Sequence, residues 1–167
     1  MREQGYELDH IKISYPEIQA DTLDDTIIPG LRWLTERYDR PVMIDDSGLF
    51  IDSLKGFPGV YSAYVFKTIG CDGVLRLMSG VGDRGARFEC CIGFMMPGRE
   101  PSISKGVAKG SISLEKAGAG GFGYDPIFVP EGYAKTYAQF EVSEKNKISH
   151  RGRAISQFLK GLPDLMK

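Results

Sequence analysis

The sequence predicts one α/β domain of mixed α+β type, in which helices flank a central twisted mixed sheet. Helical stripes of apolar residues alternate with short apolar runs that are typical of buried strands. A run of strands in the middle of the chain adds an antiparallel meander to this pattern. A length of 167 residues with 42% hydrophobic residues is enough to build one core without disulfides or metals. We therefore expect a single domain over residues 1–167.

Composition disfavours several classes of protein. Basic and acidic side chains number 21 and 22, so no overall field attracts the chain to nucleic acid or to an anionic membrane. No run approaches the ~18 apolar residues of a membrane span, and residues 1–10 contain no apolar signal region. Cys71, Cys90 and Cys91 lack metal-ligand spacing, and the adjacent pair would face opposite sides of a strand. We expect buried free thiols, no structural zinc, no nucleic-acid or membrane partner, and a cytoplasmic location.

The first elements are a strand and a helix. Residues 10–14 alternate weakly and predict a short strand, and residues 15–21 follow as a turn or extended connection. Residues 22–38 predict a helix, because their apolar side chains recur at steps of four, four and three: Leu23, Ile27, Leu31 and Leu34. Pro29 either kinks this helix or lies in its first turn.

A buried strand at residues 41–44 is expected to deliver polar side chains at its tip. The run is short and apolar, and the acidic turn DDSG at residues 45–48 follows it directly. Residues 55–64 combine two glycines and a proline with aromatic side chains, which indicates a structured loop and not a flexible linker. A helix is expected next, with three inward-facing residues, Val74, Leu75 and Met78.

The middle of the chain predicts the antiparallel meander. Strands are expected at residues 86–96, 103–110 and 111–115, where apolar and β-branched residues lie between polar turns. The glycine-rich and aromatic segment GAGGFGYDP at residues 118–126 leads into a last short strand at residues 126–129. Helices alternating with buried strands, together with this meander, are the basis for the expected mixed sheet.

The chain closes with a helix whose start carries a basic cluster. Ser149 is a good N-cap, and three residues form an apolar stripe at spacing four: Ala154, Phe158 and Leu162. The basic cluster lies at or before the helix start and contains Lys145, Lys147, His150, Arg151 and Arg153. Because the helix dipole favours anions at this end, the cluster is a candidate phosphate or base-carbonyl site. A basic run is also commonly a solvated surface, and a lone histidine is also commonly structural.

Two further segments contain residues suited to nucleotide chemistry. Asp45 and Asp46 are adjacent carboxylates that repel each other unless a cation or hydrogen-bond donors offset their charge, which indicates magnesium. An isolated DDSG string is more often a solvated turn. The glycine-rich segment could cradle a phosphate or admit a flat ligand between Phe122 and Tyr124, although it lacks the lysine of a P-loop. A flexible connection with both aromatic side chains in the core is its alternative.

Three strings at their mutual spacing resemble the Ham1/ITPase family: DDSGLFIDSLKGFPGVYSAYV, GFGYDPIFVP and EKNKISHRGRA. The shorter strings YPEIQ and DRGARF agree, so the resemblance covers nearly the whole chain from about His10 onwards. It implies an elongated, two-lobed Ham1/Maf-like fold and a homodimer. It also implies an enzyme of nucleotide metabolism that hydrolyses ITP, dITP and XTP to the monophosphate and pyrophosphate with Mg²⁺.

The resemblance also implies roles for individual residues. Glu17 and Asp46 correspond to metal-binding carboxylates, and Asp46 also to the catalytic base for the attacking water. The remaining positions correspond to substrate contacts, namely Ser47, Phe122, Gly123, Tyr124, Asp125, Lys145, His150 and Arg151. An aromatic residue of the FGYD segment would stack on the purine, and the SHR pair would contact its 6-keto oxygen. A donor aimed at that oxygen favours hypoxanthine and xanthine over adenine, which presents an amino group there.

Two departures from the family pattern are visible. The family opens with a strand and a triphosphate-binding (S/T)-x-N-x-x-K loop, which this sequence does not contain, so the first strand and most of the first helix are expected to be absent. Gly30 stands where many relatives carry a helical lysine. The alternative hypothesis is therefore a shortened, non-catalytic family member that binds purine nucleotides or only dimerises.

Overall fold

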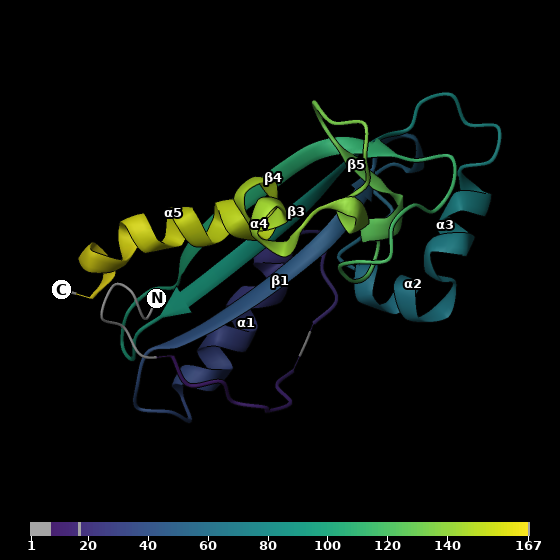
Figure 1. The fold of residues 1–167 in the computed structure, drawn as a ribbon. Helices are drawn as coiled ribbons and strands as arrows, with labels where there is room; N and C mark the ends of the chain where they lie inside the picture. Colours follow the sequence, from purple (N-terminus) through teal and green to yellow (C-terminus); the bar gives the residue numbers. More distant parts are fainter. Residues whose placement is uncertain (1–7, 17, 167) are drawn as a thin grey trace.

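Three long strands form the centre of the molecule, and helices cover both faces of the sheet that they build (Figure 1). The computed structural model describes residues 8–16 and 18–166. In that part of the chain the helices and strands follow in the order α1 (Leu23–Thr35), β1 (Val42–Ile51), β2 (Pro58–Gly59), α2 (Ser62–Thr68), α3 (Gly70–Leu77), β3 (Gly85–Met95), β4 (Ser102–Ile112), β5 (Phe128–Pro130), α4 (Val142–Ile148) and α5 (His150–Leu165). The predicted mixed α+β class is confirmed, and the molecule is elongated along its long strands.

The sheet has the strand order β2-β1-β3-β4-β5, and every pairing within the described residues is antiparallel. This differs from the mixed sheet that the sequence predicts. Residues 10–14, predicted as a strand, are exposed and lie outside any strand, so they add no further pairing. A short turn joins β3 to β4, which permits antiparallel pairing but not the crossover that parallel strands need.

β1 continues through the acidic segment that the sequence predicts as a turn. It pairs with β3 over its whole length, Val42–Ile51, so residues 45–48 lie inside the strand. The prediction of a turn at the strand tip is wrong, because a long partner strand provides pairing along the entire segment. Gly48 is required by a close approach: a Cβ atom there would lie 2.5 Å from the carbonyl oxygen of Gly59 on β2.

α1 packs on one face of the sheet through the predicted apolar stripe. The buried residues of the stripe are Leu23, Ile27, Leu31 and Leu34. The Thr22 side chain caps the helix by accepting the backbone N–H of Asp25 at 3.3 Å. Pro29 lies in the helix interior, which excludes the first-turn alternative. At Gly30 a Cβ atom would lie 2.7 Å from a ring carbon of Tyr15, so this position has no room for a longer side chain unless that ring moves.

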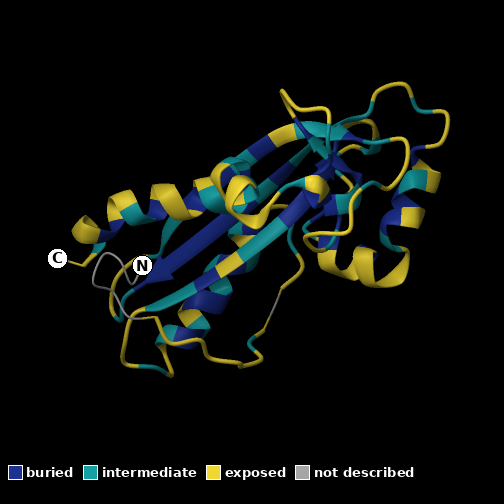
Figure 2. Ribbon diagram, viewed as in Figure 1, coloured by how far each residue is buried: buried dark blue, intermediate teal, exposed yellow. Residues whose placement is uncertain are grey.

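α5 covers the other face and confirms the prediction for the C-terminal helix. The Ser149 hydroxyl oxygen accepts the backbone N–H of Gly152 at 3.1 Å, as expected of an N-cap. The predicted stripe is buried against β3 and consists of Ala154, Phe158 and Leu162. Figure 2 shows that the outer side of α5 is exposed and its inner side is buried. The short helix α4, which the sequence did not predict, precedes it and leads the chain to this face.

α2, α3 and β5 gather at the other end of the long strands and form a second lobe (Figure 1). Residues 55–64, predicted as a structured loop, are ordered but also contain β2, and residues 62–64 begin α2, a helix that the sequence did not predict. The hydroxyl of Ser62 donates to the carbonyl of Gly59 at 2.7 Å and accepts the N–H of Leu49 at 2.8 Å. The predicted inward-facing residues of the next helix pack into the core, namely Val74, Leu75 and Met78.

Two strands have bounds that differ from the predicted ones where the meander meets this lobe. β4 is one continuous strand in place of the two predicted at residues 103–110 and 111–115, because its pairing with β3 runs on without interruption to Ser111. The strand predicted at residues 126–129 begins only at Phe128, since the preceding residues form a 3-10 turn. These shifts leave the order of the elements unchanged.

The cysteines behave as predicted. Cys71, Cys90 and Cys91 are buried and unpaired in the described part of the chain. Cys90 packs in the cluster under α5 and Cys91 in the cluster under α1, so the adjacent thiols face opposite sides of the sheet. Among the residues that the structure describes, no helix is long and apolar enough to cross a bilayer.

Candidate functional site

Three consecutive polar residues of β1, Asp45, Asp46 and Ser47, lie where one edge of this strand is open. β2 pairs with β1 only near the end of β1, so the earlier half of that edge has no strand partner within the described residues. Because side chains alternate along a strand, Asp45 and Ser47 face α5, whereas Asp46 faces α1. Their contacts agree, since Arg151 of α5 binds Asp45 and Ser47, and Thr26 of α1 binds Asp46. The acidic motif therefore serves both faces of the sheet.

Two donors hold the half-buried carboxylate of Asp46. Its Oδ1 accepts the backbone N–H of Ser47 at 2.7 Å, and its Oδ2 accepts the hydroxyl of Thr26 at 3.2 Å. Burial raises the pKa of the Asp46 carboxyl, and the nearby carboxylate of Asp45 adds to the increase, while both hydrogen bonds and Arg151 partly offset it. A carboxylate with a raised pKa beside a cleft is suited to accept a proton from water.

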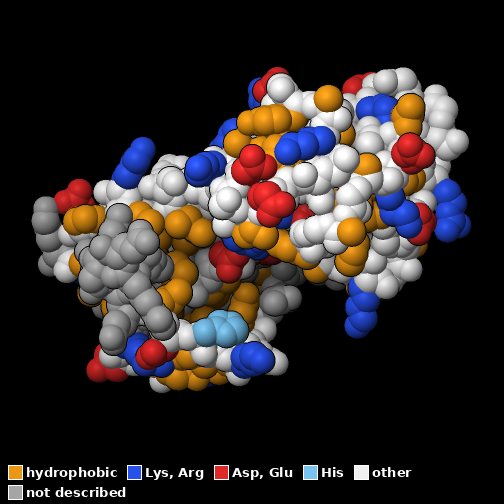
Figure 3. Space-filling view, viewed as in Figure 1, with side chains coloured by type: hydrophobic (Ala, Val, Ile, Leu, Met, Phe, Trp, Pro, Cys, Tyr) orange, Lys and Arg blue, Asp and Glu red, His pale blue; other side chains and the backbone are white. Residues whose placement is uncertain are grey.

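Asp46 opens into a cleft of about 960 Å³ between α1 and α2. Thr26, Asp45 and Asp46 line one side of it. The facing wall is apolar and aromatic and includes Phe57, Tyr61, Tyr64 and Ile69. Figure 3 shows the surface hollowed between the α1 side and the α2 side of the molecule. Among the described residues, no lysine or arginine lines this cleft, so its polar side chains carry carboxylate, hydroxyl and, at Gln19, carboxamide groups.

On the opposite face, Arg151 is tied to β1. Its Nε donates to Asp45 Oδ2 at 3.1 Å and its Nη2 donates to Ser47 Oγ at 3.4 Å. The pair is well exposed, with 37% and 46% of the two charged side chains accessible, so it adds little to stability. The contacts with Asp45 and Ser47 instead position Arg151, whose guanidinium lies 5.4 Å from the ring centroid of Phe122.

Asp125 joins the glycine-rich loop to α4. This side chain is buried, and its Oδ2 accepts the backbone N–H of Phe122 at 2.7 Å and the ammonium group of Lys145. The Lys145 side chain is 13% exposed, and its Nζ lies 4.7 Å from the ring centroid of Phe122 and 5.5 Å from that of Tyr137. Asp125 is therefore engaged with the protein itself and fixes both the loop and a cation.

The two aromatic side chains of the loop occupy different environments. Phe122 is 64% exposed, whereas Tyr124 is 4% exposed. The hydroxyl of Tyr124 donates to the carbonyl of Ser62 at 3.0 Å, and its ring meets Phe66 edge to face at 5.2 Å. Gly123 lies between them with φ of 59°, a backbone conformation that favours glycine. The chain turns there, so that one ring faces solvent and the other faces the core. Phe122 therefore has a face that a flat ligand can reach, and Tyr124 belongs to the core.

His150 is buried at the start of α5 and stacks on Phe88 of β3. The ring centroids lie 4.6 Å apart with an interplanar angle of 10°. Burial, followed by the positive charges of Arg151 and Lys145, lowers the pKa of His150 to about 3, so its imidazole is neutral near pH 7. Within the described part of the chain, His150 Nδ1 has no hydrogen-bond partner. A buried ring nitrogen in this state is stabilised by a ligand group that completes its hydrogen bond.

We expect His150 to make the free energy of unfolding depend on pH. An unfolded histidine titrates near about 6.5, whereas the folded pKa of His150 is about 3. As pH falls below the higher value, the unfolded chain binds the proton first, so the free energy of unfolding decreases by up to about 1.4 kcal/mol per pH unit. His150→Gln should flatten this dependence in urea unfolding measured from about pH 7 to pH 4.

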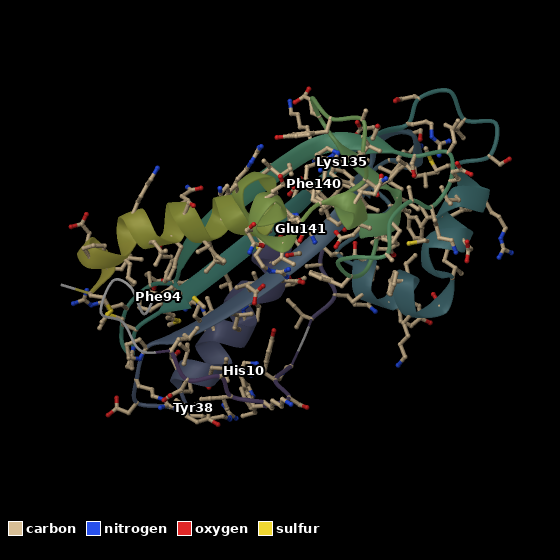
Figure 4. All side chains as sticks on the ribbon, viewed as in Figure 1. His10, Tyr38, Phe94, Lys135, Phe140 and Glu141 are labelled. Carbon is tan, nitrogen blue, oxygen red and sulfur yellow. The ribbon has the colours of Figure 1, made fainter. Side chains whose placement is uncertain are left out.

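His10 provides the matched control for this prediction. It is exposed and lies on the α1 side of the molecule with Tyr38, far along the chain from α5 (Figure 4). His10→Gln should therefore leave the pH dependence of unfolding as it is in the parent protein. A slope that is unchanged in His150→Gln, or that flattens equally in both variants, would contradict the prediction.

The predicted basic cluster divides among different partners. Lys145 and Arg151 both approach Phe122, as described above. Arg153 instead donates to a backbone carbonyl of β4 at 2.8 Å, and Lys147 is exposed. Three of the implied substrate contacts, Asp125, Lys145 and Arg151, thus meet around Phe122 on the α5 side. Tyr124 lies in the core and His150 stacks on Phe88, while the implied base, Asp46, lies across β1 on the α1 side.

The described residues supply one candidate metal ligand of the predicted pair. Each oxygen of Asp46 accepts one hydrogen bond and keeps a free lone pair, and carboxylate oxygen is the ligand type that Mg²⁺ prefers. Asp45 faces the other side and is occupied by Arg151. Glu17, the other predicted carboxylate, lies outside the described residues. Within those residues, no three acidic, histidine or cysteine side chains form a group that could hold a metal ion.

Sequence reasoning missed two residues that contact the site. Thr26 falls within the apolar stripe of α1, where a hydroxyl suggests only helix capping or exposure, and its partner Asp46 is 20 residues away. Phe88 has the pattern of an ordinary core residue, although it carries the ring of His150. A polar residue inside an otherwise apolar stripe is the one signal that could have drawn attention to Thr26.

Known proteins match this chain over most of its length. A profile of the Ham1 family matches residues 2–161. A dITP/XTP pyrophosphatase of Pyrococcus horikoshii is 53% identical over 158 residues, which cover 95% of this chain and 84% of that protein. One of Thermococcus kodakarensis is 50% identical over 163 residues, which cover 98% and 88%. The solved structure of the Staphylococcus aureus Ham1 protein has a TM-score of 0.84 and 32% identity, over 93% of this chain and 82% of that chain.

Proposed function

The chain belongs to the Ham1 family, and from this premise we propose that it hydrolyses the non-canonical purine nucleoside triphosphates dITP, ITP and XTP to the monophosphate and pyrophosphate. Relatives that share about half of its residues carry the name dITP/XTP pyrophosphatase. The observation that carries the proposal is the half-buried carboxylate of Asp46, which opens into a cleft and lies across β1 from a cationic, aromatic site at Phe122.

In the proposed reaction, Asp46 accepts a proton from the attacking water. The water oxygen forms a bond to the phosphorus of the α-phosphate, the bond from that phosphorus to the bridging oxygen breaks, and pyrophosphate leaves with the electron pair. The raised pKa of Asp46 makes its carboxylate a stronger base than an exposed aspartate. Glu17 and Asp46 would hold Mg²⁺, which would supply neutralising charge for the phosphates.

The base would lie against Phe122. Stacking of a base on an aromatic side chain contributes about 1–3 kcal/mol, and Phe122 is the exposed aromatic residue of the loop. With its proton on Nδ1, the neutral imidazole of His150 would donate to the 6-keto oxygen, and Arg151 would add a second donor nearby. Adenine offers an amino group at that position, so the same donors would be left without an acceptor. Tyr124 would act from the core by supporting the loop that carries Phe122.

The cellular setting and the assembly are also proposals. Free buried thiols suit the reducing cytoplasm. A homodimer is supported by exposed aromatic side chains between residues 57 and 66, namely Phe57, Tyr61, Tyr64 and Phe66. A solution mass equal to that of the monomer would contradict the dimer.

The function is tested by measuring pyrophosphate release from dITP, ITP, XTP, ATP and GTP side by side in the presence of Mg²⁺. We expect release from the first three nucleotides and its loss when EDTA removes the metal. Equal release from ATP would contradict recognition of the 6-keto group. If ITP binds without any release, the alternative of a nucleotide-binding protein without turnover replaces the enzyme.

A further inference from the structure

The hydroxyl of Thr26 contacts the Asp46 carboxylate from the first turns of α1. Thr26 Oγ1 lies 3.2 Å from Asp46 Oδ2 and 2.7 Å from the carbonyl oxygen of Leu23. Thr26 also lines the cleft into which Asp46 opens. We infer that Thr26 is a positioning residue that orients the Asp46 carboxylate for metal binding and proton transfer. This inference rests on the proposed function of Asp46.

Two hydrogen bonds together fix the plane of the carboxylate. The backbone N–H of Ser47 donates to Oδ1 at 2.7 Å, and Thr26 donates to Oδ2, so rotation of the group would lengthen both bonds. The terminal torsion of an aspartate has a broad intrinsic preference, and it therefore depends on such partners. Each oxygen keeps a lone pair for a cation or a water molecule. Without the hydroxyl, the Ser47 N–H would be the one donor left to the group among the residues that the structure describes.

The Thr26 side chain is itself held in one orientation. Its single hydroxyl proton is shared between the Leu23 carbonyl and the Asp46 carboxylate. The shorter contact, to the carbonyl one turn back in the helix, keeps Oγ1 on the side of α1 that faces the sheet. The Thr26 hydroxyl is therefore directed toward Asp46 in this structure.

A second set of contacts anchors this part of α1 to the sheet. Asp24 pairs with Lys105 at 2.6 Å and accepts the thiol of Cys91 at 3.1 Å. Asp46, Cys91 and Lys105 lie opposite one another on β1, β3 and β4. The row of the sheet that carries Asp46 therefore also binds the first turn of α1. These contacts hold the first turn of α1, which carries Asp24, close to the row of the sheet that contains Asp46.

The inference is tested by removing and then restoring the hydroxyl. Thr26→Val keeps the shape of the side chain, and we expect it to lower kcat for ITP by about tenfold with KM nearly unchanged, as is typical when the partner of a ligating carboxylate is removed. Mn²⁺ binding to the nucleotide-free protein, followed by electron paramagnetic resonance, should weaken by a similar factor. Thr26→Ser retains the hydroxyl and should restore both quantities.

Thr35→Val is the matched control. Thr35 lies in the same helix, and its hydroxyl donates to the carbonyl of Leu31 at 3.0 Å and contacts no carboxylate in the described residues. It should leave kcat and Mn²⁺ binding unchanged. If Thr26→Val fails to fold, Thr26→Ala provides the same comparison with a smaller side chain.

The possible outcomes separate this inference from the proposed function. Parent-like kcat and Mn²⁺ binding in Thr26→Val, alongside an inactive Asp46→Asn, would overturn the role of Thr26 and leave the proposed function standing. Equal losses in Thr26→Val and Thr26→Ser would overturn it as well, because the hydroxyl would then not be the group that matters. Full activity of Asp46→Asn would instead remove the proposed function of Asp46.

Discussion

Replacing Asp46 with asparagine is expected to reduce pyrophosphate release from ITP by on the order of 10²–10⁴-fold, the usual contribution of a positioned base. The amide has nearly the same shape but cannot accept the proton of the attacking water, and it is a poorer ligand for Mg²⁺. Steady-state assays with ITP and saturating Mg²⁺ measure the loss. The structural reason is specific to Asp46, whose carboxylate opens into the cleft with one lone pair free on each oxygen.

The same variant has an expected effect on stability. Because burial raises the pKa of the Asp46 carboxyl, its ionised form is unfavourable in the folded protein. A neutral amide should therefore leave the melting temperature unchanged or raise it, as is common when a functional charge is removed. Scanning calorimetry of the two proteins gives the comparison. A clear drop in melting temperature would show that Asp46 serves the fold.

Asp45→Asn is the matched control for Asp46→Asn. The two carboxylates are neighbours in sequence, but Asp45 faces α5 and binds Arg151 at 3.1 Å. Its loss should raise KM for ITP through the released guanidinium, with kcat kept within about tenfold, since the base itself is untouched. Equal loss of kcat in the two variants would contradict separate roles on the two faces of β1.

Asp125→Asn is expected to lower the free energy of unfolding by about 3 kcal/mol, because it leaves the mostly buried ammonium of Lys145 without its partner. The value is at the lower end for a buried pair, since 13% of the Lys145 side chain remains exposed. KM for ITP should rise in parallel, because Asp125 also holds the backbone N–H of Phe122 at 2.7 Å. Urea unfolding and steady-state kinetics measure the two effects.

Asp72→Asn is the matched control, because Asp72 pairs with Lys116 at 2.9 Å on the surface of the same lobe. Both of these side chains are well exposed, so water replaces the lost partner and unfolding should change very little. KM for ITP should also stay as it is. Comparable destabilisation by Asp72→Asn and Asp125→Asn would show that burial of the Asp125 pair has no special importance.

The helices that pack on the sheet could be predicted from the sequence, because their signal is local. In α1 and α5 the apolar residues recur every three or four positions, and capping residues stand immediately before both helices. Ser149 makes the capping bond that the sequence predicts, and Thr22 caps α1 in the same way. Such patterns depend on the geometry of a single helix, so they can be recognised in the sequence when the rest of the fold is unknown.

The extent of β1 could not be predicted, because it depends on a partner strand far along the chain. Polar residues 45–48 have the composition of a turn, yet β3 pairs with them from about 45 residues away. The same pairing decides that Asp45 and Asp46 face opposite sides of the sheet. Residues 10–14 show the converse, since their strand-like alternation meets no partner strand in the described part of the chain.

For the candidate site, the motifs named segments that the structure brings close together, but they did not reveal the contacts that the side chains make there. Phe122 and Tyr124 are equivalent by type in the sequence, and only packing against Ser62 and Phe66 places Tyr124 in the core. The basic run from Lys145 to Arg153 looks like one cluster, but its members bind different elements. Side-chain partners across the fold are long-range contacts, which a one-dimensional pattern does not contain.

By itself, the sequence determined the α+β class, the two packing helices, the free thiols and the three segments from which the site is built. These features follow from residue type and short-range periodicity, which the chain carries in every conformation. Only the tertiary structure decided that β1 runs through its acidic motif, that Asp46 meets Thr26, and that Asp125 holds Lys145. Each of these contacts joins segments about 20 or more residues apart, and each exists only after the strands have chosen their partners and register.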